Sequence, residues 1–578
     1  MVAIHTGRHA KVGRPSTQAV SVGASIGVMT PPGFRGTYRA DDDARGVYSE
    51  SAGISRILPR AVAVPADAED VVTLAGWANA TQTPLIPRGA GSSMSGAAIG
   101  DGVIVDFSRL ASIGPVDLKT RRVWVGPGAV RDHVDAVAKA HGLWFPVDPS
   151  SGAWATIAGM VATNAAGPHT MKHGAMRRWV TALDCVFDDG SRATIRRGAE
   201  LPSQAKTVAA IRRFSSQAMS TIFTTAMAEP VARIRHAGVR KESSGYALVE
   251  FAKSGDLVDL FAGSEGTLAL IVGVELQLLE RPAGRTSLCA GFTTLESAVE
   301  AAGRAAGLGA ATCELLDRTF LDVVRKGAPQ MDVPADVEAL LLLDAEAETQ
   351  AAADILADSI TAAFTALGAV GLTRASDPGA IEQLWHIRHA ASPLLATMTD
   401  IGASMQFIED GAVPPAALPE YVRGVRSILE HHGFTGVIFG HAGDANVHVN
   451  PLVDVRRPDW RAHVEAALDE VVTLTAVLGG TLAGEHGDGR LRTPFMARMW
   501  ASDAIVLFEL VKRCFDPRGI LNPGVKVALP GQRPLTDIKY DPKLAPLTPA
   551  AERALRTVND ERAYAQLRLD LLTNQTPG

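Results

Sequence analysis

Residues 84–96 read PLIPRGAGSSMSG, a short apolar run between two prolines that opens into a turn of small residues. We expect Leu85 and Ile86 to lie in a buried strand that leads into this turn. Consecutive small residues leave backbone N–H groups free, and such groups can bind phosphate. The spacing is GxGxxxxG, and no helical pattern begins directly at Gly96, which excludes a Rossmann dinucleotide site. Taken alone, the turn fits a phosphate-binding loop and an ordinary surface loop equally well.

Short strands and helices alternate on both sides of this turn. Apolar residues recur at helical spacing within 67–78, residues 102–106 form a predicted strand, and 130–140 form a predicted helix. Such alternation is typical of an α/β arrangement. The later run at 155–167 has no bulky polar side chain, so its backbone can approach a large flat ligand closely. These segments predict a cofactor-binding domain in the first half of the chain.

Two segments of the second half carry a dense group of ionisable side chains. They are GHAGDANVH at 440–448 and GEHGDG at 484–489, each preceded by an apolar run. A single histidine is most often an ordinary polar residue of the surface. Three histidines and a glutamate in two glycine-framed segments are instead the ligand set of a catalytic divalent metal. Because Gly487 and Gly489 follow Glu485 and His486 closely, an HExxH helix is excluded, which argues against a hydrolase.

The composition limits the possible classes of protein. The 578 residues are 47% hydrophobic and 20% charged, which predicts a globular, core-forming chain of two to four domains. The net charge of −6 does not indicate a protein that binds nucleic acid. No apolar run reaches the roughly 18 residues of a membrane span. The four cysteines form no CxxC pair, which argues against a disulfide framework or an iron–sulfur cluster. The first forty residues contain no Asp or Glu and fit either a mitochondrial transit peptide or a flexible arm.

Several motifs resemble a known family in the expected order. PLIPRGAGSSMSG, DPSSGAWATIAGMVATNAAGP at 148–168, KESSGY at 241–246 and GSEGTLALI at 263–271 resemble the FAD-binding domain of the vanillyl-alcohol oxidase and p-cresol methylhydroxylase superfamily. The resemblance extends from about Tyr48 to Lys526. It therefore covers nearly the whole chain outside the two ends.

Three later motifs point to one branch of that superfamily. GHAGDANVHVNP at 440–451, GEHGDGRLRTPF at 484–495 and FDPRGILNPG at 515–524 are similar to the D-2-hydroxyacid dehydrogenases. That branch includes D-lactate dehydrogenase, D-2-hydroxyglutarate dehydrogenase and the glycolate oxidase flavoprotein subunit. In the D-2-hydroxyglutarate enzymes a lysine precedes the segment matching 410–414, and Ile408 stands here instead. Recognition of a second substrate carboxylate is therefore in doubt.

The resemblance implies an α+β chain with a two-subdomain FAD-binding domain and a ferredoxin-like cap domain. Two strand–helix–strand units between 287 and 367 support the ferredoxin-like part. The expected boundaries are an N-terminal arm at 1–45, the FAD-binding domain at 46–283, the cap at 284–514, and a C-terminal segment at 515–578 that returns to the FAD domain. The tail after about residue 530 has no assigned role.

The resemblance also implies noncovalent FAD, because Ser92 stands where some members carry a flavin-linked histidine. The residues expected to contact FAD lie in the small-residue segments and in the last motif. They are Pro87, Arg88, Gly89, Ala90, Gly91, Ser92, Ser93, Gly96, Pro149, Ser150, Thr156, Gly159, Asn164, Gly167, Gly263, Glu265, Gly266, Ile271 and Asn522.

Oxidation of a 2-hydroxyacid requires a base for the hydroxyl proton and an acceptor for the C2 hydrogen. A metal beside the hydroxyl stabilises the developing alkoxide. We assign His441, His448 and Glu485 as ligands of a divalent metal, with zinc preferred and manganese and iron(II) also compatible. His486 is the expected general base, since an imidazole has an ordinary pKa of about 6.5. The family resemblance gives the same roles to these four positions.

Two further residues are expected to contact the substrate. An isolated helix arginine is usually solvent-exposed, but Arg388 ends an LWHIR pattern that is similar to the family's carboxylate-binding helix. A guanidinium binds a carboxylate bidentately. Asn450 lies two residues beyond His448 and therefore on the same face of a strand. Both side chains are predicted to face the substrate.

We therefore expect an FAD- and metal-dependent oxidoreductase that converts a D-2-hydroxyacid of the D-lactate or D-2-hydroxyglutarate type to the 2-oxoacid. The alternatives are a glycolate oxidase-type flavoprotein subunit, a non-redox FAD transferase resembling alkyldihydroxyacetonephosphate synthase, and a subunit that binds FAD only for assembly. The expected partners are the hydroxyacid and an electron acceptor such as a quinone, a cytochrome or an electron-transfer protein. We expect a homodimer in the cytoplasm, peripheral at a membrane, or in the mitochondrial matrix of a eukaryote.

Overall fold

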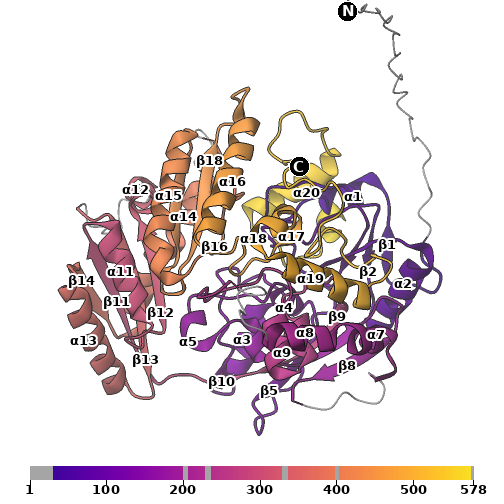
Figure 1. Cartoon of the computed structure of the whole chain (residues 1–578), viewed down its shortest axis with the longest axis horizontal. Coiled ribbons are helices and arrows are strands. Elements are labelled where there is room, and N and C mark those ends of the chain that lie inside the picture. Colours follow the sequence, from indigo (N-terminus) through magenta and orange to yellow (C-terminus); the bar gives the residue numbers. More distant parts are fainter. Residues whose placement is uncertain (1–29, 199–205, 228–235, 328–335, 398–401, 574–578) are drawn as a thin grey trace, which may run out of the picture.

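The computed structural model of the chain describes residues 30–198, 206–227, 236–327, 336–397 and 402–573. Figure 1 shows two parts, with the cap at the left and the sheets of the first half at the right. The yellow C-terminal segment lies against the right-hand part, beside the elements nearest the N-terminus. The arrangement is the predicted α+β fold. The domain boundaries expected from the sequence stay predictions.

The first sheet of the FAD-binding part contains four short strands in the order β1-β2-β4-β3. They are β1 (Thr37–Arg39), β2 (Ala61–Val64), β3 (Leu85–Arg88) and β4 (Val103–Asp106). Strand β4 runs parallel to β2 and β3, and β1 is antiparallel to β2. One face packs on α2 (Ala68–Thr81), whose N-terminus is capped by the Asp67 side chain. Strand β3 is thus an edge strand of a buried sheet, and the glycine-rich turn follows it directly.

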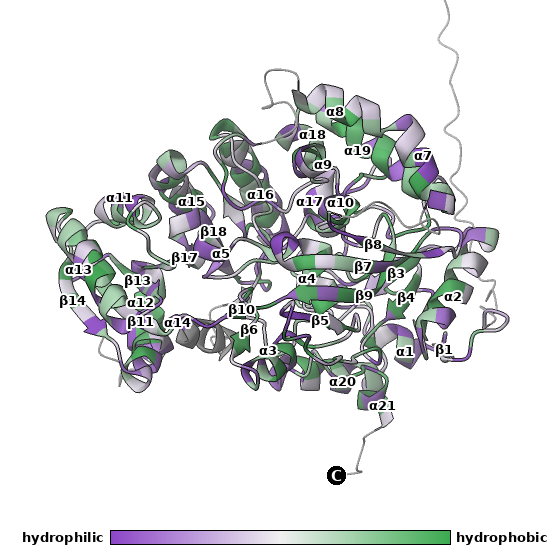
Figure 2. Ribbon diagram, turned by 90° about the horizontal axis from the view of Figure 1, so that it is seen from below, coloured by the Kyte–Doolittle hydropathy of each residue, from purple (hydrophilic) through white to green (hydrophobic). Residues whose placement is uncertain are grey.

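The second sheet is antiparallel and has the order β5-β9-β7-β8. Its strands are β5 (Arg122–Val125), β7 (Val180–Val186), β8 (Arg192–Arg196) and β9 (Leu270–Gln277). In Figure 2 the strands β7 and β9 are mainly green and lie at the centre of this part of the molecule. Their apolar side chains form one core with helices that include α3 (Arg131–Lys139) and α4 (Ile157–Thr163). The two separate sheets confirm the two-subdomain organisation.

The cap begins with a ferredoxin-like unit. Strands β11 (Gly284–Phe292), β12 (Thr312–Asp317), β13 (Ala339–Ala347) and β14 (Val370–Ala375) lie in the order β14-β11-β13-β12, and all neighbours are antiparallel. This is the order 4-1-3-2 that two consecutive strand–helix–strand units produce. Helices α11 (Leu295–Ala305) and α13 (Gln350–Ala366) pack together on one face of the sheet. The predicted ferredoxin-like cap is confirmed.

The same sheet is then extended by the strands that carry the histidines of the 440–448 segment. Strand β17 (Thr435–His441) pairs with β12, and β18 (Asn446–Val453) pairs with β17. Strands β15 (Ala403–Ser404) and β16 (Gly411–Ala412) both pair with β18. On the second face, α12 (Arg318–Gly327) and α14 (Pro378–Thr397) cover the sheet. Helix α14, which carries Arg388, and the histidine strands are therefore parts of one layered structure.

The C-terminal segment crosses back to the FAD-binding part. After α19 (Ser502–Phe515), Leu521 forms a parallel bridge with Leu85 of β3. Helix α20 (Pro549–Asp560) then packs on α1 (Asp42–Val47), and the two share a core with the second face of the first sheet. A Cβ at Gly46 would lie 2.7 Å from the Cβ of Ala551, so this helix pair needs glycine there. Residues beyond α19 therefore pack on both the edge and one face of the first sheet.

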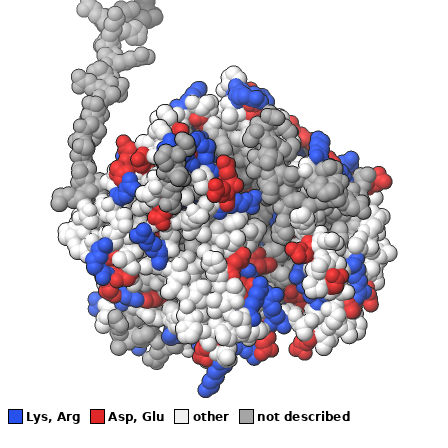
Figure 3. All heavy atoms as spheres, turned by 180° about the vertical axis from the view of Figure 1, so that it is seen from behind, with Lys and Arg blue, Asp and Glu red and all other residues white. Residues whose placement is uncertain are grey.

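The surface and the helices give two further observations. On the face shown in Figure 3, basic and acidic side chains are interspersed among the described residues. Among the helices that the structure describes, none combines the length and the apolar character needed to cross a bilayer.

An ionic network joins the FAD-binding part to the cap. The His169 ring lies between two carboxylates, with Nδ1 2.6 Å from Asp148 Oδ2 and Nε2 3.1 Å from Glu346 Oε1. Lys172 Nζ adds a contact of 3.1 Å to Glu346 Oε2. Burial alone would lower the pKa of His169, but Asp148 and Glu346 outweigh it and raise the pKa to about 10. The imidazolium is thus the stable form at neutral pH.

Because the pKa of His169 is higher in the folded chain than in the unfolded chain, its contribution to stability is complete below about pH 6.5 and is lost as the pH rises through about 10. We expect His169→Gln to lower the free energy of unfolding by about 3 kcal/mol at pH 6 and by clearly less at pH 10. Urea titrations at both pH values measure the difference. His141→Gln, at an exposed histidine, is the control. An equal loss at both pH values would contradict this assignment.

Candidate active site

A cavity of about 1030 Å³ lies between the FAD-binding part and the cap, and the C-terminal segment completes its wall. Its walls contain the glycine-rich turn after β3, the small-residue run around α4, and the histidine strands β17 and β18. Binding pockets for cofactors and drug-sized ligands reach about 1,000 Å³. The cavity is therefore large enough for a dinucleotide together with a small substrate.

The walls of the cavity fit a cofactor that approaches the backbone closely. A Cβ at Gly89 would lie 2.0 Å from Thr156 Oγ1, so only glycine allows the turn to pack on α4. Gly91 has a φ of +70°, which favours glycine. Thr156 lines the cavity, and its buried Oγ1 has no hydrogen-bond partner within the described chain. A buried hydroxyl without a partner indicates that a ligand supplies one.

Most of the residues predicted to contact FAD lie in the wall of this cavity. Those in the wall are Pro87, Arg88, Gly89, Ala90, Gly91, Ser92, Ser93, Pro149, Ser150, Thr156, Gly159, Glu265, Gly266, Ile271 and Asn522. Gly96, Asn164, Gly167 and Gly263 lie outside it. Asn164 ends α4 in the left-handed conformation, and its side chain accepts a hydrogen bond from the Arg177 backbone. Its position is that of a structural residue behind the wall.

The three predicted metal ligands converge on one point at the cap side of the cavity. Nε2 of His441 and Nε2 of His448 lie 3.1 and 3.2 Å from Oε1 of Glu485. Ligands of a tetrahedral zinc with bonds of about 2.0–2.1 Å are about 3.3 Å apart. All three side chains are buried. The donor types and their spacing therefore fit a divalent metal with an open position toward the cavity.

A buried carboxylate orients one of these ligands. Oε1 of Glu314, on β12, accepts a hydrogen bond from Nδ1 of His441, and its Oε2 accepts one from Nε of Arg388 at 2.8 Å. Glu314 is fully buried, which raises the pKa of a carboxyl, but His441 and Arg388 outweigh burial and lower it. With the Nδ1 proton held by Glu314, the Nε2 lone pair of His441 faces the ligand position. One carboxylate thus fixes both a metal ligand and the predicted substrate-binding arginine.

A lysine from the FAD-binding part contacts the third ligand. Nζ of Lys241, in the KESSGY motif, lies 3.1 Å from Oε2 of Glu485, and both side chains are buried. Burial raises the pKa of Glu485, but Lys241 and His441 outweigh it and hold the pKa well below its usual range. Glu485 is therefore ionised, as a metal ligand must be. The contact also ties the cap to the FAD-binding part at the site itself.

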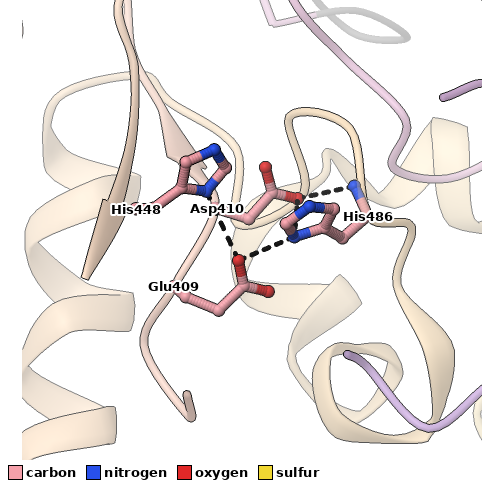
Figure 4. A group of neighbouring side chains, drawn as sticks. All are labelled: Glu409, Asp410, His448 and His486. Carbon is pink, nitrogen blue, oxygen red and sulfur yellow. Dashed lines mark hydrogen bonds and ion pairs between the residues drawn. The ribbon is translucent and has the colours of Figure 1, made fainter. Parts of the chain in front are cut away.

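Figure 4 shows the group around His486, in which Glu409 faces the imidazole. Nδ1 of His486 donates a hydrogen bond of 2.7 Å to Glu409 Oε2. The adjacent Asp410 accepts hydrogen bonds from the backbone N–H groups of Glu485 and His486. In the neutral imidazole, a proton held on Nδ1 by Glu409 leaves the Nε2 lone pair of His486 available as a base. This is the pairing of a histidine with an orienting carboxylate that general-base catalysis uses.

The charges around His486 make its protonation sensitive to a cation. Burial lowers the pKa of His486, but Glu409, Asp410 and Glu485 outweigh it and raise the pKa to about 10 in the protein alone. A divalent ion beside Glu485 would offset part of this negative charge and lower the pKa toward neutrality. The protonation of His486 and the binding of a cation beside Glu485 would therefore be electrostatically linked.

The two predicted substrate residues lie in the same wall. Arg388, on α14, lines the cavity, and its guanidinium lies over the Phe439 ring with Cζ 4.7 Å from the centroid. Asn450, on β18, also lines the cavity together with His448. Because side chains alternate along a strand, His448 and Asn450 share one face of β18, as the sequence predicts. Arg388, Asn450 and the histidine group thus surround one end of the cavity.

Four residues of the site were not assigned from the sequence: Lys241, Glu314, Glu409 and Asp410. Glu314 had a usable signal, since it is a charged residue within the buried run TCELLD of β12. No comparable sequence signal is given by Lys241, Glu409 or Asp410. In the structure, Asp410 adopts a φ of +73° that non-glycine residues rarely adopt. Its side chain binds the backbone of the 484–486 loop and Arg492.

Two family models match successive parts of the chain. Residues 59–196 match an FAD binding domain. Residues 281–525 match the C-terminal domain of FAD linked oxidases. The first match contains the glycine-rich turn and α4, and the second contains Arg388 and the whole histidine group. The cavity therefore lies where the two matched regions meet.

Curated relatives carry the names of hydroxyacid-oxidising proteins. The chain is 28% identical to a D-2-hydroxyglutarate dehydrogenase of Pseudomonas putida, over 86% of this chain and 51% of that protein. It is 27% identical to the glycolate oxidase subunit GlcD of Bacillus subtilis, over 84% of this chain and 93% of that protein. It is 29% identical to a D-lactate dehydrogenase of Archaeoglobus fulgidus, over 81% and 92%. The chain spans about half the length of the Pseudomonas relative.

Solved structures show the same fold at lower sequence identity. A 4-ethylphenol oxidase from Gulosibacter chungangensis has a TM-score of 0.60 at 14% identity, with 86% of this chain and 94% of that chain covered. An alkyldihydroxyacetonephosphate synthase has a TM-score of 0.56 at 14% identity, with 84% and 83% covered. At this identity the likeness concerns the fold alone. The two family matches and the curated relatives together establish that the chain belongs to the FAD-linked oxidases of the vanillyl-alcohol oxidase and p-cresol methylhydroxylase superfamily.

Proposed function

We propose that this chain oxidises a D-2-hydroxyacid of the D-lactate or D-2-hydroxyglutarate type to the 2-oxoacid, with hydride transfer to noncovalent FAD and assistance from a divalent metal. The names of the curated relatives support the substrate class. The observation that supports the proposal most strongly is that three groups lie together at one end of the cavity. They are the buried set His441, His448 and Glu485, the Glu409–His486 pair, and Arg388. When bound, FAD supplies a hydride acceptor and the divalent ion supplies a Lewis acid.

In this proposal the chain's own residues position the substrate and move one proton. Arg388 binds the C1 carboxylate, and Asn450 contacts the same molecule from β18. Nε2 of His486 takes the hydroxyl proton, and Glu409 holds the imidazole and stabilises its charged form. His441, His448 and Glu485 hold the divalent ion, with zinc preferred over manganese and iron(II). Binding of the substrate, removal of the proton and binding of the metal are thus assigned to different side chains.

Electrons must then leave the flavin for an acceptor outside the site. The cysteines Cys185, Cys289, Cys313 and Cys514 are all free, and they are widely spaced in the sequence. We therefore propose an external quinone, cytochrome or electron-transfer protein as acceptor, and a homodimer as the assembly. A glycolate oxidase-type reaction is the nearest alternative, since it needs the same ligand set and the same carboxylate contact.

Anaerobic titration of the holoprotein tests the reaction and its stereochemistry. We expect D-lactate or D-2-hydroxyglutarate to bleach the oxidised flavin absorbance, with L-lactate inactive because the base and the hydride acceptor must lie on fixed sides of C2. Glycolate in the same series identifies the alternative. Flavin that dithionite reduces, but that no D-2-hydroxyacid or glycolate reduces in metal-replete protein, would refute the proposal and favour the non-redox transferase class.

A further inference from the structure

The C-terminal segment of the chain reaches the cofactor cavity. It lies beyond residue 525, where the second family match ends. Six of its residues line the cavity: Lys539, Tyr540, Asn559, Asp560, Arg562 and Tyr564. A tail that only covered the outside of the sheet would contribute no residues to this wall. The segment therefore has a position from which it can contact the bound cofactor.

Several contacts fix this position. The backbone N–H of Arg56 donates to Asp537 O at 2.8 Å, and that of Lys539 donates to Ile54 O at 2.8 Å, as in a short antiparallel pairing. Leu555 and Leu567 are buried in the core that α20 shares with α1 and the first sheet. Because the backbone is held on both sides of the cavity-lining residues, their side chains are presented to the cavity by a rigid support.

An aromatic and cationic group stands at this part of the wall. The rings of Trp154 and Tyr564 lie 6.0 Å apart at 36°, and Arg562 Cζ lies 5.6 Å from the Trp154 ring. Trp154 belongs to the small-residue run before α4, whereas Tyr564 and Arg562 belong to the tail. Trp154 and Tyr564 are only half-buried, and all three residues line the cavity. Two aromatic faces and a guanidinium are the groups that bind planar rings and phosphates.

The backbone of Arg562 adds an independent observation. Its φ is +54°, in the left-handed region that costs free energy for a side chain other than glycine. The residue follows Glu561, the C-cap of α20, at the position where glycine would be the ordinary choice. Strained residues that persist cluster at sites where the side chain has a function. The guanidinium of Arg562 is thus retained at a position that disfavours it.

We propose that Trp154, Arg562 and Tyr564 form a clamp on FAD, supplied in two of its three members by the C-terminal segment. The proposal rests on FAD occupying the cavity, as the family implies. It extends the cofactor site beyond the two matched regions and gives the tail a role in retaining a flavin that no covalent bond holds. The ligand class is a flavin dinucleotide, bound through ring stacking and through attraction of its diphosphate to the guanidinium.

Titration of flavin-stripped protein with FAD tests the clamp. We expect Arg562→Gly and Tyr564→Ala each to raise the Kd for FAD about tenfold, because each removes one stacking or cationic contact. Arg562→Gly also relieves the left-handed strain, so its melting temperature without FAD should stay within about 2 °C of the wild type or rise. A merely structural arginine would instead show a loss of stability and an unchanged Kd.

Two matched controls are available. Arg121 has a φ of +54° as well and lies outside the cavity wall, so Arg121→Gly should leave the Kd for FAD unchanged. Tyr564→Phe keeps the ring and should bind FAD as the wild type does. Binding within twofold of the wild type by both Arg562→Gly and Tyr564→Ala would overturn the clamp. Failure of the wild-type protein to bind FAD at all would instead refute the proposed function, so the two failures are distinguishable.

Discussion

His486→Ala is expected to lower the rate of flavin reduction by the preferred D-2-hydroxyacid by about 10²- to 10⁴-fold. The alanine cannot accept the hydroxyl proton, and the other two imidazoles of the group, His441 and His448, are the proposed metal ligands. FAD should stay bound, because His486 lies at the cap end of the cavity. Anaerobic stopped-flow absorbance measures the reduction rate, and the flavin content of the purified variant measures retention.

Glu409→Gln provides a graded comparison for this variant. The amide can still contact Nδ1 of His486 but no longer stabilises the imidazolium, so reduction should slow by less than in His486→Ala. His463→Ala, at a histidine outside the cavity wall, should reduce flavin normally. Reduction of flavin by His486→Ala at the wild-type rate would remove His486 as the base.

Glu314→Gln is expected to weaken both metal binding and substrate binding. It should lower the affinity for zinc about 10- to 100-fold, because Glu314 orients the His441 ligand. It should also raise the KM for the hydroxyacid, because Arg388 loses its charged partner. Zinc affinity is measured by competition with a chromophoric chelator, and KM and kcat by dye reduction in zinc-saturated protein. A rise in KM that persists with zinc saturated separates the arginine effect from the metal effect.

Asp317→Asn is the matched control on the same strand. Asp317 is also a fully buried carboxylate of β12, and it pairs with Arg426 at 2.8 Å, but it does not line the cavity. Its loss should lower stability by about 3–5 kcal/mol while zinc affinity and KM stay unchanged. If Glu314→Gln also left both quantities unchanged, Glu314 would have no positioning role.

The sequence predicts those parts of the structure that local patterns determine. The turn at 84–96 requires glycine at Gly89 and Gly91, so its composition reveals it. The ferredoxin-like strand order follows from two strand–helix–strand units with clear apolar periodicity. His441, His448 and Glu485 converge as expected, because short glycine-framed segments carry them.

Contacts that depend on strand register could not be predicted in this way. Glu314 meets His441 because β12 pairs with β17 with Leu315 opposite Gly440, a pairing between segments 125 residues apart in the chain. Helix α14 must then cover the same sheet for Arg388 to reach Glu314. No local pattern specifies either event. Glu314 was not assigned from the sequence for this physical reason, although the two residues that it contacts, His441 and Arg388, were.

The packing of α20 on α1 has a consequence for folding of the chain. Helix α1 and the face of the first sheet that bears Val62 and Ile104 are covered by residues 554–569. The strands of both sheets in the first half are complete by residue 277, and domains generally fold in the order in which they emerge from the ribosome. This apolar face of the first sheet therefore stays uncovered in the nascent chain until residues 554–569 have been made.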